Sequence, residues 1–154
     1  MFSLARITKN TSRNFRQLQS LNFVQRQSYA TVKYSKDHEW VRFESGKQAV
    51  VGISEEAQSK LGEIVHVALS VKVGDVIQAS SVIGEVESVK SVSEVYSPVS
   101  GKITAVNAVL NDNPGVVNES AEADGWMIKL EFEQEAEELM SKDAYQKYCE
   151  EQEH

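Results

Sequence analysis

Residues 84–101 read GEVESVKSVSEVYSPVSG, a stretch that places Lys90 at the centre of a near-palindrome of valines and small polar residues. The valines at positions 86, 89, 92 and 95 recur every three residues, which fits neither a half-buried strand nor a helix. The segment is therefore predicted to break into two short strands, Val82–Glu87 and Glu94–Tyr96, joined by a turn at residues 89–92. No glycine, asparagine or proline marks that turn, so turn composition alone does not place it. The pattern predicts a hairpin that displays Lys90.

The chain on the N-terminal side of this hairpin is typical of a small, mostly β domain. Two β-rich runs, Trp40–Glu44 and Gln48–Ile53, flank Ser45-Gly46-Lys47, which predicts a hairpin turn. Ser54 can cap a following helix, and Gly62 can close it in the left-handed conformation. Residues 64–86 supply more strand material, and turn signals recur at the spacing expected of a β sandwich or barrel.

The C-terminal side adds a few further elements. A turn between Pro98 and Gly101 is predicted to lead into a strand at residues 102–107, and a loop at residues 112–115 precedes a last strand at residues 126–133. Residues 134–151 are predicted to form helix in two pieces, with Ser141 capping the second. A weak internal echo also relates Val73–Ile77 to Val99–Ile103, on opposite sides of Lys90.

Five segments resemble, in the same order, landmarks of the glycine cleavage system H protein family. They are Tyr34–Trp40, Gly52–Gly62, Glu87–Ser91, Ser97–Gly101 and Gly125–Leu130. The third and fourth together resemble the family's lipoyl-attachment segment. The resemblance runs from about residue 32 to the C-terminus. It implies a mostly β (α+β) fold, the flattened barrel or barrel-sandwich hybrid of lipoyl and biotinyl carriers. A short internal helix and C-terminal helices would complete it.

The resemblance also implies a function for Lys90. Lipoate would be attached covalently to this lysine, and the chain would be a cofactor-carrying shuttle of the glycine cleavage system with no catalytic residue of its own. The arm would accept an aminomethyl group from the pyridoxal-phosphate glycine decarboxylase and present it to the tetrahydrofolate-dependent aminomethyltransferase. Dihydrolipoamide dehydrogenase would then reoxidise it. Lipoyl ligase or transferase enzymes would attach the cofactor, and the carrier is expected to be a monomer.

Two carboxylates match the cleft into which the family's loaded arm folds, namely Glu39 and Glu94. A carboxylate suits this role because a protonated amine needs a charge-assisted hydrogen-bond partner. The alternative for each is a solvated surface acid, and the sequence favours neither reading.

Rival classes are judged from the residues beside the lysine. A biotin carrier would have methionines where Val89 and Ser91 stand, and an acyltransferase lipoyl domain would be followed by a linker and a catalytic domain. A lipoyl relay or an interaction protein with the same fold stays open. The histidines His38, His66 and His154 show no metal-ligand spacing, and the sequence predicts no metal site.

The first thirty residues are of a different kind. They contain no acid and five bases, with several apolar residues that fit one side of a basic amphipathic helix. This composition predicts a mitochondrial presequence over residues 1–30, cleaved between Arg26 and Lys33, and a carrier domain over residues 31–154 in the mitochondrial matrix.

Removal of those residues makes the chain strongly acidic. The whole chain has 16 basic and 23 acidic residues, and loss of five bases leaves 11 against 23, a net charge of −12. Such a charge argues against binding to nucleic acid or an anionic membrane and favours partners with basic surfaces. The single cysteine, Cys149, excludes an intramolecular disulfide, as suits a reducing compartment.

Overall fold

The computed structural model describes residues 31–134 and 138–153, so the predicted presequence lies outside the described part. The strands are β1 Thr31–Tyr34, β2 Glu39–Glu44, β3 Gln48–Ile53, β4 Ile64–Leu69, β5 Val76–Ile77, β6 Val82–Ser88, β7 Val92–Tyr96, β8 Ser100–Val106 and β9 Ile128–Gln134. The helices are α2 Glu55–Leu61, α3 Val109–Asp112, α4 Val116–Ser120 and α5 Lys142–Gln152. None of the helices in this part is long and apolar enough to cross a membrane.

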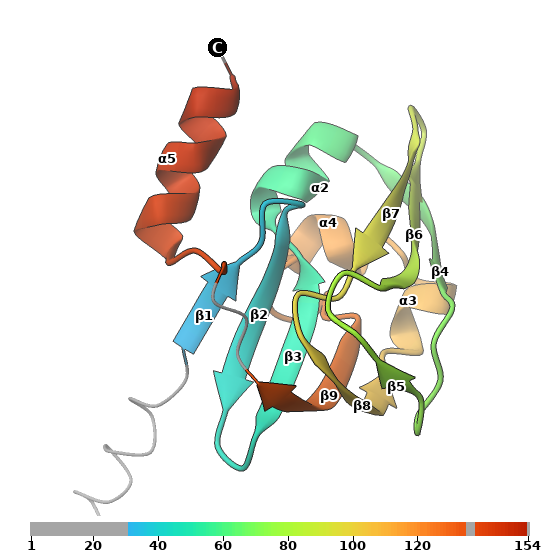
Figure 1. Cartoon of the computed structure of the whole chain (residues 1–154). Helices are drawn as coiled ribbons and strands as arrows, with labels where there is room; N and C mark the ends of the chain where they lie inside the picture. Colours follow the sequence, from blue (N-terminus) through green and yellow to red (C-terminus); the bar gives the residue numbers. More distant parts are fainter. Residues whose placement is uncertain (1–30, 135–137, 154) are drawn as a thin grey trace, which may run out of the picture. The chain divides into compact units, whose positions relative to one another are not determined.

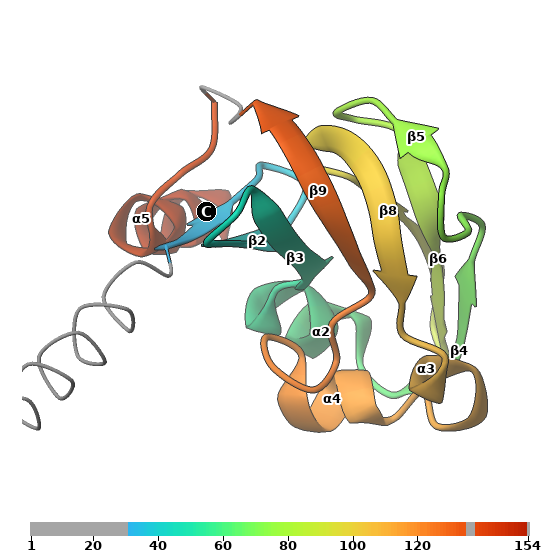
Figure 2. The ribbon, with the colours of Figure 1, turned by 90° about the horizontal axis from the view of Figure 1, so that it is seen from below.

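The strands form two antiparallel sheets (Figures 1 and 2). The larger sheet has the order β1-β2-β3-β9-β8-β5, and the smaller has the order β4-β6-β7. In Figure 1 the β6–β7 hairpin reaches upward at the right of the molecule. The predicted mostly β fold is therefore confirmed, and the hairpin predicted around Lys90 is present.

The elements near β2 and β3 follow the local sequence closely. Gly46 and Lys47 both have positive φ, 72° and 59°, which matches the right-handed twist of the strands they join. The Ser54 hydroxyl accepts a hydrogen bond from the backbone N–H of Ala57 at 3.1 Å, as predicted for a helix cap. Gly62 ends α2 with φ 81° and ψ −148°, so the predicted glycine is there but its conformation is not left-handed helical.

The predictions on the C-terminal side were right only in part. A bend is present at Pro98-Val99, but β8 begins at Ser100, so Gly101 lies inside the strand. Its missing side chain lets β9 approach closely, since a Cβ there would meet the Glu131 carbonyl oxygen at 2.2 Å. The predicted loop is present at residues 113–115, but the short helices α3 and α4 on either side of it were not predicted. The described ends of the first predicted helical piece are not helical. Gln134 is the last residue of β9, and Met140 forms a β-bridge with Tyr34. The second piece is α5, capped by Ser141 as predicted.

The internal echo corresponds to a contact between its two halves. Val76 and Ile77 of β5 pair with Lys102 and Gly101 of β8 in antiparallel register. The two echoed segments therefore lie side by side at one edge of the larger sheet.

The core has two parts. The larger lies between the sheets and α4, and its fully buried members include Val41, Val51, Ile83, Ile103 and Leu130. The smaller lies between α5 and the opposite face of β1–β3, and it contains Tyr34, Trp40, Val50, Tyr145 and Cys149. The strands β2 and β3 are consequently buried on both faces, and Glu39 is the first residue of β2.

Candidate functional site

Ser88 closes the turn that carries Lys90. Its hydroxyl accepts hydrogen bonds from the backbone N–H groups of Lys90 at 3.2 Å and Ser91 at 3.1 Å. Its own N–H donates to the Ser91 carbonyl at 2.8 Å. Neither Val89 nor Lys90 has a positive φ. The Ser88 side chain thus stabilises this turn without the glycine or asparagine that most two-residue hairpins contain. This explains why the turn could not be located from its composition.

A further bond ties the turn to the neighbouring strand. The Val89 N–H donates to the Glu63 carbonyl, just before β4, at 3.1 Å. All three backbone N–H groups of residues 89–91 therefore have partners within the fold. The Lys90 side chain is exposed, and its ammonium forms no ion pair with any residue of 31–134 or 138–153. The site combines a firmly held backbone with an unobstructed primary amine.

Glu39 is buried, contrary to the alternative of a solvated surface acid. Its side chain is 2% exposed, and both carboxylate oxygens accept hydrogen bonds. The Tyr96 N–H donates to Oε1 at 2.8 Å, and the Ser35 hydroxyl donates to Oε2 at 2.5 Å. Burial raises the pKa of the Glu39 carboxyl, and these two hydrogen bonds oppose the increase. Glu39 therefore joins the start of β2 to the end of the strand that leads from Lys90.

Glu94 is exposed on β7 and accepts a hydrogen bond from the Tyr96 hydroxyl at 2.8 Å. This bond raises the pKa of the Tyr96 phenol. Tyr96 thus contacts both predicted carboxylates, Glu39 through its backbone and Glu94 through its side chain. Sequence reasoning missed Tyr96 and Ser35, although Tyr96 stands two residues after Glu94 and so shares its strand face.

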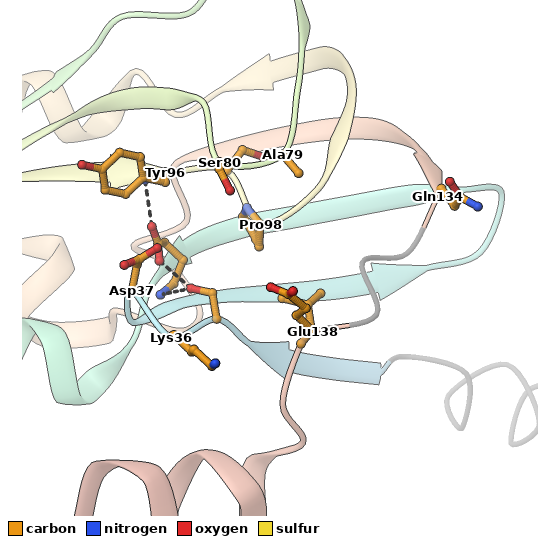
Figure 3. Close-up of a pocket in the computed structure, with 12 residues that line it drawn as sticks. Lys36, Asp37, Ala79, Ser80, Tyr96, Pro98, Gln134 and Glu138 are labelled. Atoms are coloured by element: carbon orange, nitrogen blue, oxygen red, sulfur yellow. Dashed lines mark hydrogen bonds between the residues drawn. The ribbon is translucent and has the colours of Figure 1, made fainter. Parts of the chain in front are cut away.

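Glu39 and Tyr96 line a cavity of about 670 Å³. Its wall is formed by residues 35–37 and Glu39, by residues 79–80, by the segment Tyr96–Pro98 and by residues near the end of β9 (Figure 3). Asp37 and Glu138 add two more carboxylates, against one ammonium from Lys36. Glu94 is outside this lining. The structure therefore brings Glu39 and Glu94 to the same tyrosine but not into one cavity.

Lys90 is in the turn that precedes β7. It lies four positions before Glu94, which corresponds to about 13 Å of extended chain. The Lys90 amine does not itself contact either carboxylate. A group attached to this amine is needed to connect the hairpin tip to the cleft.

The glycine cleavage H-protein family model matches residues 32–152 of the chain. The chain belongs to this family. Members carry a lipoyl group covalently on a lysine and act as non-catalytic carrier subunits of the glycine cleavage system. The chain is accordingly a lipoyl carrier H protein and not an enzyme, and the other components of that system are its partners.

Individual H proteins match a similar length of the chain. The glycine cleavage system H protein of Halalkalibacterium halodurans is 50% identical over 123 residues, covering 79% of this chain and 94% of its own. The mitochondrial glycine cleavage system H protein 2 of Arabidopsis thaliana is 46% identical over 123 residues, covering 79% of this chain and 78% of its own. A crystal structure of an H protein from Mycobacterium marinum superposes with a TM-score of 0.69 and 30% identity, covering 80% of this chain and 97% of the other.

Proposed function

We propose that Lys90 is the lysine that carries the lipoyl group. The observation that supports this is its position: an exposed amine that forms no ion pair with any described residue, on a turn whose backbone is held by Ser88 and Glu63. Acylation requires the amine to enter another enzyme's active site, so an exposed lysine at a hairpin tip is suited to attachment of the lipoyl group. When bound, the lipoyl group supplies a redox-active disulfide at the end of a long arm.

Peptide mapping tests this assignment. Protein expressed in cells that lipoylate their own proteins is digested and analysed by mass spectrometry, beside the variants Lys90→Arg and Lys102→Arg. Lys102 is a suitable control because it is also an exposed lysine on a strand. One lipoyl group is expected on Lys90 in the unaltered protein and in Lys102→Arg, and none in Lys90→Arg. A lipoyl group on another lysine of Lys90→Arg contradicts the assignment.

Glu39 and Glu94 are proposed as the acidic groups that receive the amine of the loaded arm. Both are carboxylates that accept hydrogen bonds around Tyr96, and Asp37 and Glu138 make the adjoining cavity acidic. A protonated amine gains a charge-assisted bond there, and a site partly closed to water protects a labile group.

Charge-removing variants test this role. Glu94→Gln is expected to shorten the lifetime of the amine-loaded protein in the absence of partners. Glu85→Gln provides the matched control, because Glu85 is exposed and directly opposite Glu94 on β6 but makes no bond to Tyr96. Equal lifetimes for the two variants show that Glu94 does not receive the amine.

The cellular place of the chain is proposed as the mitochondrial matrix, with residues 1–30 removed as a presequence. The acid-free, basic composition of these residues and the similarity to a mitochondrial relative in Arabidopsis support this. The partners would then be the matrix forms of glycine decarboxylase, aminomethyltransferase and dihydrolipoamide dehydrogenase, with lipoyl ligase or transferase enzymes loading Lys90. N-terminal sequencing of the endogenous protein is expected to give a start between residues 27 and 33, whereas a start at Met1 or Phe2 excludes the cleavage.

A further inference from the structure

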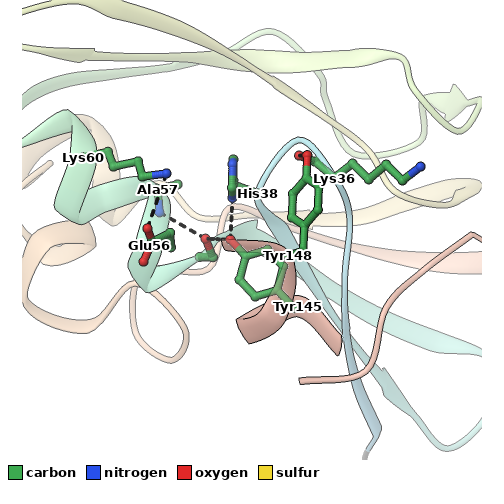
Figure 4. A network of polar contacts seen from close by, with 8 residues as sticks. Lys36, His38, Glu56, Ala57, Lys60, Tyr145 and Tyr148 are labelled. Carbon is green, nitrogen blue, oxygen red and sulfur yellow. Dashed lines mark hydrogen bonds and ion pairs between the residues drawn. The ribbon is translucent and has the colours of Figure 1, made fainter. Parts of the chain in front are cut away.

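The helix α5 is hydrogen-bonded to residues 34–40, which join β1 to β2 and contribute to one wall of the cavity; these residues are called the 34–40 turn. The Tyr145 hydroxyl lies 2.6 Å from His38 Nδ1 and 2.7 Å from the Ser54 hydroxyl. Figure 4 shows Tyr145 and His38 facing each other beside the start of α2. His38 has a φ of 70°, and its carbonyl accepts from the Ser54 N–H at 2.9 Å. Tyr145 therefore joins α5, the turn and the cap of α2 through a single hydroxyl.

Two more contacts connect the same turn to the C-terminal segment. The Tyr148 hydroxyl donates to the Lys36 carbonyl at 3.2 Å. Tyr34 and Met140 exchange a pair of backbone hydrogen bonds, each 2.8 Å long. Residues 34, 36 and 38 are thus each bonded to α5 or to the segment that leads into it.

Most residues of the turn also border the cavity. Ser35, Lys36, Asp37 and Glu39 line it, whereas Tyr34 and Trp40 belong to the buried cluster beneath α5. The Glu39 backbone is therefore continuous with residues that α5 holds from behind. Its carboxylate reaches Tyr96 across the cavity wall at 2.8 Å, so any shift of the turn changes that bond.

We propose that α5 positions the acidic cleft, with Tyr145 and Tyr148 as positioning residues that act through the 34–40 turn on Glu39. Neither tyrosine touches the cavity. They fix the turn in the conformation that points Glu39 at Tyr96. The consequence for the lipoyl arm rests on the proposed role of Glu39, whereas the consequence for the Glu39–Tyr96 bond does not.

Amide hydrogen exchange measured by NMR on the intact protein tests the first consequence. The reporter is the Tyr96 N–H, which Glu39 accepts, and the reference is the Met127 N–H, which donates to the Val51 carbonyl in the core at 2.8 Å. Tyr145→Phe keeps the ring but removes the hydroxyl. It is expected to accelerate exchange at Tyr96 about tenfold more than at Met127, because the loss of two hydrogen bonds loosens the turn.

Tyr34→Phe is the matched control. The Tyr34 ring stacks on the Tyr145 ring with centroids 4.4 Å apart, but its hydroxyl donates to Glu122 instead of to the turn. This variant removes a hydroxyl from the same aromatic pair, so a general loss of stability raises both exchange rates by the same factor. If Tyr145→Phe also changes the two amides equally, the inference is wrong.

If Tyr145→Phe does not fold, Tyr148→Phe is used for the same measurement. It removes only the bond to Lys36 and is expected to raise the Tyr96 exchange rate a few-fold relative to Met127; an unchanged ratio overturns the inference. The lifetime of the amine-loaded protein separates the two proposals. A changed Tyr96 amide with an unchanged lifetime supports the positioning role of α5 and shows that Glu39 does not hold the arm.

Discussion

Replacement of Glu39 by alanine and by glutamine separates what its hydrogen bonds contribute to the free energy of unfolding from what its charge contributes. Glu39→Ala leaves the Tyr96 N–H and the Ser35 hydroxyl without their acceptor at a position where the glutamate is 2% exposed. An unsatisfied buried group costs about 1–3 kcal/mol, and relief of the buried charge offsets part of this. We expect Glu39→Ala to lower the free energy of unfolding by about 2 kcal/mol.

Glu39→Gln preserves the hydrogen-bond geometry. Its amide oxygen can accept from the Tyr96 N–H, while its amide nitrogen can donate to the Ser35 hydroxyl oxygen. The change in the free energy of unfolding is expected to stay within about 1 kcal/mol at pH 7, because the lost charge is one that burial already disfavours. The alanine and glutamine variants should therefore differ although both remove the charge.

The pH dependence gives an independent check. The folded pKa of Glu39 is raised, so the folded state binds more protons than the unfolded state as pH rises from about 4.5. The free energy of unfolding of the wild type, relative to Glu39→Gln, is highest below the unfolded pKa and falls as pH rises through the folded pKa. Urea unfolding followed by tryptophan fluorescence at several pH values measures both effects. A glutamine variant as unstable as the alanine variant, with no pH-dependent difference from wild type, refutes this reasoning.

Three further predictions concern the scaffold of the site. Ser88→Ala removes the acceptor of the Lys90 and Ser91 N–H groups and is expected to cost about 1 kcal/mol in urea unfolding, with faster amide exchange at the tip; unchanged exchange at both amides contradicts the role given to this hydroxyl. Gly101→Ala places a Cβ against a strand carbonyl and is expected to lower the unfolding free energy by roughly 3 kcal/mol, whereas a loss below about 1 kcal/mol means that β8 and β9 separate easily there. Burial lowers the pKa of His38, so the unfolded state takes up its proton first and wild-type stability falls as pH drops through and below 6.5. His38→Asn tolerates the positive φ and is expected to show a shallower fall over that range; identical pH profiles in urea unfolding contradict it.

The position of α5 has a consequence for the strands beneath it. One face of β2 and β3 packs in the core between the sheets, while Trp40 and Val50 on the other face are covered by Tyr145 and Cys149 of α5. The indole N–H of Trp40 also donates to the Ala121 carbonyl at 2.9 Å. Removal of α5 therefore exposes apolar surface on the same strand that begins with Glu39.

Local sequence determined the elements whose partners are close in the chain. The valine spacing around Lys90 excluded a single continuous strand, and the β6–β7 hairpin follows because its two strands are neighbours in sequence. Gly46-Lys47 and the Ser54 cap were predictable for the same reason, since each joins residues no more than four positions apart.

The tertiary structure decided the features whose partners are distant. The acceptor role of Glu39 depends on Tyr96, 57 residues away, and the attachment of α5 depends on the contact of Tyr145 with His38, 107 residues away. The sequence pattern near Glu39 is the same for a solvated acid as for a buried one. Only the approach of β7 and α5 to the 34–40 turn makes it buried, because burial is a property of the whole packing and not of local spacing.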